Sequence, residues 1–351
     1  MHAHAHAPES LPQVTRVLVL SHRDDQRARL VRDIEADGLG AVICEARDVE
    51  AANRFLSQGQ APHVLVIDAQ SVREELQDTL RGWTQQTGRA IVVVSDTPED
   101  AVLALSAGAV CATPSPRVDD LGAPAADHLR KAIAAAAVCT PVYRPPAALH
   151  TLPDLPFARA EQRIIAIAGG LGSAAALESL IAHLPPSVPG IIAMVDVPGE
   201  WVDALAARLN RVGVLDVAVA SHGDPVMPGT VYLAPTDRQV SVNRSEHGFT
   251  VQVGPRLTAS SRPAVFFREI ATAAGSSALG VLLGSADTDA AEGLFALKQS
   301  GARTLAEDPE SAVCGEALRA ALNRGSVTEL THLRRLPWRI LEEALVTALP
   351  G

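Results

Sequence analysis

The segment IIAIAGGLGSAAALESLIAHL, residues 164–184, joins an apolar run of strand length to a glycine-rich turn and then to an amphipathic helix pattern. A second apolar run, GIIAMVDV at 190–197, follows directly. Strand, tight turn, helix and strand in this order predict a βαβ unit with parallel strands. Because the working residues of such sheets lie on loops at the carboxyl ends of strands, the same segment indicates where a functional site should be sought.

The alternation of strand and helix patterns continues along the chain in both directions, so we expect two doubly wound, mainly parallel α/β domains. Five further apolar runs predict strands: VTRVLVL (14–20), HVLVIDA (63–69), AIVVVSD (90–96), TVYLAP (230–235) and SALGVLLGS (277–285). Four amphipathic patterns predict helices: 24–38, 128–137, 290–301 and 309–325.

The length of 351 residues also predicts two domains. The segment TPVYRPPAALHTLPDLPFARAEQR, which begins at Thr140, holds five prolines and is typical of a stiff, extended spacer. We therefore expect a disordered tail at 1–13, a first domain at 14–136, a proline-rich linker at 137–160 and a second domain at 161–351.

Charge disfavours nucleic acid as a partner, since 40 acidic against 30 basic side chains give a formal net charge of −10. The longest alanine-rich apolar run, 132–139, is far shorter than the ~20 residues that cross a bilayer. The first residues, MHAHAHAPES, lack the pattern of a secretory signal. These features predict a cytoplasmic protein without membrane insertion.

The cysteines give no sign of a metal site or a disulfide framework. Cys44, Cys111, Cys139 and Cys314 are far apart in sequence and form no CxxC pair. We expect reduced, mostly buried thiols, and neither a metal nor a cofactor.

The glycine turn allows one alternative function. Gly170, Gly172 and Ala175 fit the pattern G-x-G-x-x-A, and Asp196 ends the next apolar run 24 residues after Gly172. This is the layout of a dinucleotide-binding turn, in which a pyrophosphate meets a helix N-terminus and the acid binds a ribose hydroxyl. An NAD(P)-binding α/β protein is therefore one hypothesis.

Longer blocks carry a resemblance that covers nearly the whole chain. MPGTVYLAP (227–235), and AEGLFALKQSGA (291–302) followed by AEDPESAV (306–313), are the most specific of them. With these blocks the chain resembles the chemotaxis response regulators called protein-glutamate methylesterases, the CheB family. The resemblance implies a receiver-like, flavodoxin-like N-terminal domain joined by a linker to an α/β methylesterase-like domain.

In that family a serine attacks the methyl ester, a histidine takes its proton and an aspartate orients the histidine. The resemblance places Gly170 at the nucleophile position and Asp196 at the base position, so both catalytic groups are substituted. Asp289 is at the position of the orienting acid. Ser173, three residues after Gly170, is a weak alternative nucleophile.

The receiver-like domain has lost residues of the same kind. A receiver needs an acidic pair for Mg²⁺, a phospho-accepting Asp, a hydroxyl residue and a Lys. The resemblance places Ser21 and His22 at the acidic pair, Asp68 at the phospho-acceptor and Ser95 at the hydroxyl position. The lysine is missing.

These substitutions favour a protein of receptor methylation signalling, in chemotaxis or pilus-driven motility, that is impaired in catalysis and works by binding. The expected partners are the cytoplasmic region of a chemoreceptor, a chemosensory histidine kinase or a methyltransferase. An active methylesterase with a non-standard site made from Asp289, Asp196 and Ser173 is the enzyme alternative.

Overall fold

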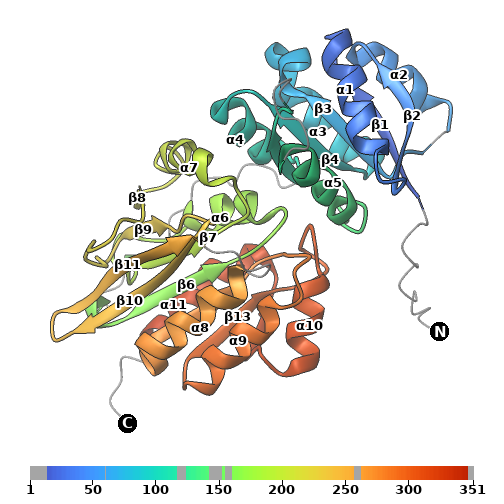
Figure 1. Ribbon diagram of the computed structural model, residues 1–351. Coiled ribbons are helices and arrows are strands. Elements are labelled where there is room, and N and C mark those ends of the chain that lie inside the picture. Colours follow the sequence, from blue (N-terminus) through green and yellow to red (C-terminus); the bar gives the residue numbers. More distant parts are fainter. Residues whose placement is uncertain are drawn as a thin grey trace.

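Two parallel sheets organise the computed structural model, which describes residues 14–59, 61–116, 124–141, 152–154, 160–256 and 262–346 (Figure 1). The first sheet and its helices precede the predicted linker, and the second sheet and its helices follow it. The α/β class expected from the alternating patterns is confirmed.

The N-terminal sheet has five parallel strands in the order β2-β1-β3-β4-β5. This is the flavodoxin-like order that receiver domains share, with chemistry expected at the carboxyl ends of the strands. The strands are β1 (Thr15–Leu20), β2 (Gly40–Ala46), β3 (Val64–Asp68), β4 (Ala90–Ser95) and β5 (Cys111–Pro114).

Side chains along these strands alternate between two helical layers, as the strand period of two requires. Val64 and Val66 of β3 pack toward α1 and α5, whereas Leu65 and Ile67 pack toward α2, α3 and α4. The helices are α1 (Asp24–Glu35), α2 (Val49–Ser57), α3 (Leu76–Thr87), α4 (Pro98–Ala107) and α5 (Pro124–Ala136), and a 3₁₀ segment, η1 (Ala69–Glu75), precedes α3.

The C-terminal sheet has seven parallel strands in the order β14-β13-β12-β6-β7-β9-β8. An antiparallel hairpin, β10 (Arg238–Ser245) and β11 (Gly248–Arg256), lies beside it. The strands of the sheet are β6 (Ile164–Ala168), β7 (Ile191–Met194), β8 (Asp216–Val219), β9 (Thr230–Leu233), β12 (Ala278–Leu282), β13 (Arg303–Glu307) and β14 (Glu329–Thr331).

Helices cover both faces of this second sheet. The face formed by Ile165 and Ile167 of β6 packs against α6, α7 and α11, while Ile164 and Ala166 face α8, α9, α10 and the hairpin. The helices are α6 (Ser173–Ile181), α7 (Val202–Leu209), α8 (Arg262–Ala274), α9 (Ala290–Gln299), α10 (Glu316–Arg324) and α11 (Leu336–Val346), with short 3₁₀ segments η2 (Ala160–Gln162), η3 (Gly199–Trp201), η4 (Gly275–Ser277) and η5 (Leu333–Arg335).

The helix predicted over 309–325 is wrong in its first half, because α10 begins only at Glu316. Residues before it form a loop in which the Val313 carbonyl accepts a hydrogen bond from the Thr140 amide at 2.9 Å, and the Cys314 carbonyl accepts one from the Ser285 amide at 2.8 Å. These tertiary bonds use carbonyls that a helix would pair internally, and they outweigh local helix propensity.

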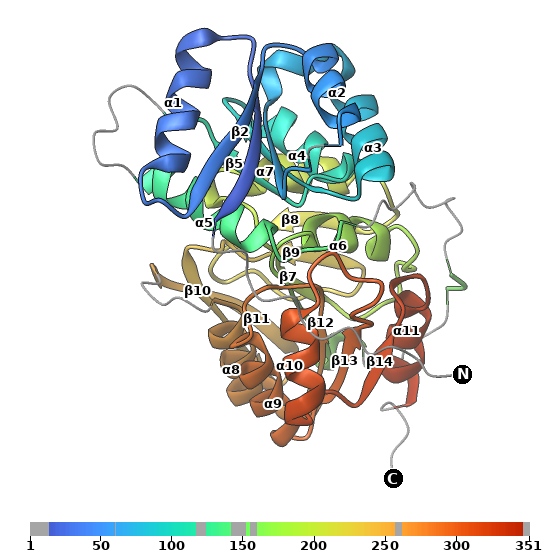
Figure 2. The ribbon, with the colours of Figure 1, turned by 90° about the vertical axis from the view of Figure 1, so that its right-hand side faces the viewer.

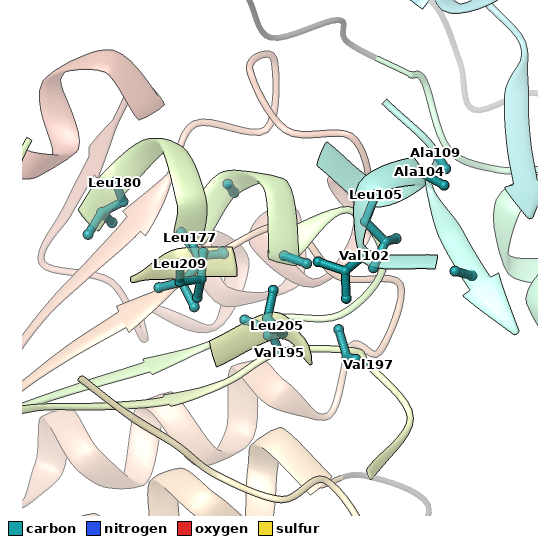
Figure 3. Packing of buried hydrophobic residues seen from close by; sticks show 14 of the residues in the cluster. Val102, Ala104, Leu105, Ala109, Leu177, Leu180, Val195, Val197, Leu205 and Leu209 are labelled. Atoms are coloured by element: carbon teal, nitrogen blue, oxygen red, sulfur yellow. The ribbon is translucent and has the colours of Figure 1, made fainter. Parts of the chain in front are cut away.

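The two domains share one apolar seam. Val102 and Leu105 of α4 belong to the same buried cluster as Val195, Val197 and Leu205 of the C-terminal domain, and Figure 3 shows the α4 side chains pointing toward them.

Polar contacts accompany this packing at the seam. The Ser106 hydroxyl on α4 donates to the Glu178 carboxylate on α6 at 2.6 Å, and the Arg208 guanidinium on α7 donates to both. Seen from the side in Figure 2, α5 lies at the boundary between the domains. The seam therefore holds the carboxyl-end loops of the C-terminal sheet against the first domain.

The expected division at residues 13, 136 and 160 stays a prediction. α5 ends at Ala136, but the expected tail at 1–13 and the linker segments 142–151 and 155–159 lie outside the described residues. None of the helices that the structure describes has the length and apolar character needed to cross a membrane.

Candidate functional site

A cleft of about 460 Å³ lies between the domains, at the carboxyl ends of β6 and β7. Gly170 and Asp196 line it from the C-terminal domain, together with Arg262 and Ser285. His128 of α5 lines it from the N-terminal domain. The cleft therefore brings together the predicted nucleophile and base positions, as the carboxyl-edge rule for parallel sheets requires.

Ser173 holds the glycine turn together rather than facing the cleft. Its side chain is fully buried, and its hydroxyl donates to the Gly170 carbonyl at 2.5 Å. The same hydroxyl accepts a long hydrogen bond from the Asp196 amide at 3.4 Å. Its hydrogen bonds link the start of α6 to the loop after β7, which is a stabilising role for a hydroxyl in the first turn of a helix.

The space beside Gly170 is filled by Ser285. A Cβ atom at position 170 would lie 2.5 Å from the Ser285 Oγ and 3.0 Å from its Cβ, closer than side chains approach. Ser285 is fully buried and follows β12. The Ser285 amide donates to the Cys314 carbonyl, and the Ser285 carbonyl accepts from the Ala317 amide. The Ser285 hydroxyl accepts from the Asp287 amide at 3.0 Å. The backbone of Ser285 is therefore fixed on both sides.

Asp196 lines the cleft, and its side chain is exposed to the solvent there. The protein around the cleft shields the Asp196 carboxyl from part of the water and raises its pKa, while the nearby Arg262 and His128 act in the opposite direction. Arg262 belongs to α8 of the same domain and His128 to α5 of the other domain. A carboxyl group with a raised pKa is suited to exchanging protons. The histidine that the resemblance leads us to expect as the base is, however, absent from position 196.

Asp289 lies apart from these groups. It is the residue before α9, it is exposed, and it is not among the residues that line the cleft. Its amide donates to the Asp287 carboxylate at 3.0 Å, and its carbonyl accepts from the Glu292 amide at 2.9 Å. The structure thus brings Gly170, Asp196 and Ser285 together and leaves Asp289 at the rim of the domain.

Asp68, at the position expected for the phospho-acceptor, is in contact with the arginine Arg23. Asp68 ends β3 and is fully buried, and its Oδ2 atom accepts from the Ser21 hydroxyl at 2.7 Å and from the Arg23 Nε at 3.1 Å. The Arg23 guanidinium also reaches the Asp96 carboxylate at 3.3 Å. Arg23 therefore bridges two carboxylates at the carboxyl edge of this sheet.

These residues do not fit Mg²⁺. That ion needs several hard oxygen ligands in octahedral array. At the two positions expected for its acidic pair the chain has a hydroxyl, on Ser21, and an imidazole, on His22. The Arg23 guanidinium already supplies a positive charge to Asp68 and would repel a dication. The Ser95 hydroxyl is turned toward the next loop, where it donates to the Thr97 carbonyl at 2.9 Å.

Four residues of the two sites were not predicted from sequence as contributing side chains: Arg23, His128, Arg262 and Ser285. Of these residues, only Arg23 could have been suspected from the sequence, because it comes directly after Ser21 and His22, the positions expected for the acidic pair. The other three enter the cleft from α5, from α8 and from the loop after β12, and no sequence spacing relates these elements.

The glycine turn also bears on the nucleotide hypothesis. Gly172 has φ +79°, and its amide, next to the start of α6, donates to the Val110 carbonyl of the N-terminal domain at 3.0 Å. An amide that a pyrophosphate would need is thus already used by the other domain. The nucleotide alternative is not favoured.

This arrangement is that of a response-regulator protein in which a receiver-like domain packs on the carboxyl edge of a doubly wound, parallel α/β domain. The family model described as CheB methylesterase matches residues 165–340. With that match and the relatives below, the chain belongs to the CheB methylesterase family, and the expected resemblance is confirmed.

Two curated relatives extend over most of the chain. A protein of Anaeromyxobacter dehalogenans named protein-glutamate methylesterase/protein-glutamine glutaminase 4 is 33% identical over 96% of this chain and 97% of its own length. A second, from a group 3 operon of Rhodopseudomonas palustris, is 32% identical over 86% and 91%. Among solved structures, the CheB methylesterase catalytic domain of Thermotoga maritima is 25% identical over 52% of this chain and 98% of that chain, with a TM-score of 0.49.

We predict that Gly170→Ser destabilises the fold by about 1–3 kcal/mol, because the added side chain overlaps Ser285. The double variant Gly170→Ser/Ser285→Gly should recover part of that loss, since it removes the Oγ and Cβ atoms that are in the way and leaves the residue 285 Cα at 3.1 Å. Urea denaturation measures both. Gly82→Ser on α3, where an added Cβ meets only the Gln86 Nε2 at 4.0 Å, is the control. Equal destabilisation by the single and double variants would contradict this account.

We also predict that Asp68 stays unphosphorylated when the protein is incubated with acetyl phosphate and excess Mg²⁺. The expected result in intact-mass spectrometry is an unchanged mass, while a competent receiver domain treated in parallel gains a phosphoryl group. A gain of one phosphoryl group that disappears in Asp68→Ala would show that Arg23 does not keep the cation away.

Proposed function

We propose that this chain is a non-hydrolytic adaptation protein of a chemosensory pathway, which binds a chemoreceptor cytoplasmic region, a histidine kinase or a methyltransferase. The names of its relatives describe hydrolysis of glutamyl methyl esters and glutamine side chains. Both reactions need a nucleophile and a base, and this chain has Gly170 and Asp196 at those positions. Loss of either group costs on the order of a millionfold in triad hydrolases.

The single observation that carries the proposal is the position of the Ser285 side chain against Gly170. A serine nucleophile at position 170 would overlap it, because the Cβ atom alone would lie 2.5 Å from the Ser285 Oγ. The chain therefore lacks the nucleophile and also lacks the room for one. This packing supports a fold kept for binding, in which Ser285 occupies the space beside Gly170.

The enzyme alternative has less support. It needs Asp289, Asp196 and Ser173 around one ester, but Asp289 is exposed outside the cleft and Ser173 is fully buried with its hydroxyl donated to Gly170. A buried hydroxyl that is already donated to a carbonyl has no proton acceptor placed for attack.

Binding is the measurement that tests the proposal. The full-length protein is titrated by calorimetry with the cognate receptor cytoplasmic fragment, in methylated and unmethylated forms, and with the cognate kinase and methyltransferase. We expect at least one of them to bind with micromolar affinity. If none binds at that concentration, the proposal fails.

A pair of variants on α8 locates the binding surface. We expect Arg262→Glu to weaken binding about tenfold, or ~1.4 kcal/mol, because it reverses the charge inside the cleft. Arg268→Glu, two turns along the same helix and half exposed beside Glu292, should leave binding unchanged. Equal effects of the two substitutions would place the binding surface away from the cleft.

A further inference from the structure

Two cysteines of different domains lie in contact. Cys139 follows the end of α5 by three residues, and Cys314 lies in the loop between β13 and α10. They are 175 residues apart in sequence, and their Sγ atoms are 2.8 Å apart. Both cysteines are free thiols, as expected from the sequence, and the domain packing brings together two positions that no sequence spacing relates.

The backbone beside both cysteines is already paired across the interface. The Thr140 amide donates to the Val313 carbonyl at 2.9 Å, so the residues next to Cys139 and Cys314 are hydrogen-bonded to each other. Disulfides require neighbouring backbones with side chains directed at one another, and this pair needs little movement to meet that requirement.

We propose that Cys139 and Cys314 form a reversible disulfide that fastens the N-terminal domain to the loop supporting Ser285. The oxidant is of the peroxide class. The Cys139 thiolate attacks one oxygen of hydrogen peroxide, the O–O bond breaks, and a sulfenic acid and hydroxide form. The Cys314 thiolate then attacks the sulfenic sulfur and releases the second hydroxide. The two thiol protons convert the hydroxides into two waters, so two electrons pass from the sulfurs to the peroxide.

The surroundings give the two sulfurs different parts in this reaction. Cys139 is half-buried and meets solvent, whereas Cys314 is 1% exposed. The hydrogen bond with Cys139, burial and the nearby Glu316 carboxylate raise the pKa of the Cys314 thiol. Oxidant therefore reaches Cys139 first. The Cys314 thiol donates to the Glu316 carboxylate at 3.1 Å, so it can pass its proton to that carboxylate as it attacks the sulfenic sulfur.

A Cys139–Cys314 disulfide would hold the two sides of the interdomain cleft together. The Cys314 carbonyl accepts the Ser285 amide at 2.8 Å, and Cys139 continues from α5, which supplies His128 to the cleft. A covalent link between these two places holds the N-terminal domain over Gly170 and Asp196. Reduction frees the domains to separate at the seam. This inference is independent of whether the cleft binds a receptor.

Thiol counting tests the bond. The full-length protein is treated with hydrogen peroxide, quenched, unfolded and alkylated with N-ethylmaleimide, and its peptides are mapped by mass spectrometry. We expect the number of alkylated cysteines to fall from four to two, with a Cys139–Cys314 peptide pair that dithiothreitol removes. Cys139→Ser, which changes the half-buried partner, should abolish the pair even if Cys314→Ser disturbs folding.

Cys111→Ser and Cys44→Ser are the matched controls and should retain the Cys139–Cys314 pair. Cys111 is the sharper control, because it is buried and lines the cleft at the same domain boundary. Four alkylated cysteines after oxidation, or a cross-link that maps to Cys111, would overturn the proposal.

Hydrogen exchange measures the mechanical consequence. The amides of Gly172 and Thr140 both donate across the domain interface. We expect their exchange to slow several-fold on oxidation, while amides inside β1 exchange at the same rate in both states. Equal exchange of Gly172 and Thr140 in the oxidised and reduced protein would show that the bond does not hold the domains together.

Discussion

The N-terminal domain packs on the carboxyl edge of the C-terminal sheet, and this contact forms both the cleft and the Cys139–Cys314 pair. Parallel strands place their functional loops at that edge, and here the edge is covered by α4, β5 and α5. The seam buries apolar side chains from both domains in one cluster. Backbone bonds from Gly172 to Val110 and from Thr140 to Val313 fix the register of the two surfaces. Every group of the cleft, and the thiol pair behind it, is positioned by this contact.

Close packing accounts for the glycine at position 170. A protein interior tolerates changes that conserve volume, and a glycine at position 170 is matched by a serine at position 285. The same principle applies in the first domain, where Arg23 supplies the positive charge that the buried Asp68 needs. At both positions the buried polar side chains are hydrogen-bonded within the protein.

Strands and helices with a local sequence pattern could be predicted from the sequence. Apolar runs such as 164–168 and 278–282 predicted the strands, because a strand buried on both faces is apolar at successive positions. The hairpin at 238–256 was not predicted, and the loop before Glu316 was expected to be helical. In that loop, hydrogen bonds from Thr140 and Ser285 decide the conformation, and these partners are distant in the chain. The contact of Ser285 with Gly170 escaped prediction for the same reason.

Methanol release from the methylated cognate receptor is the most direct test of the claim that this family member is not a hydrolase. The full-length protein is compared with a typical active methylesterase of the family and with a buffer blank. The account predicts no release above the blank while the reference enzyme is active. Release that Asp289→Ala or Asp196→Ala abolishes would contradict it, because a working site would then exist without a serine at position 170.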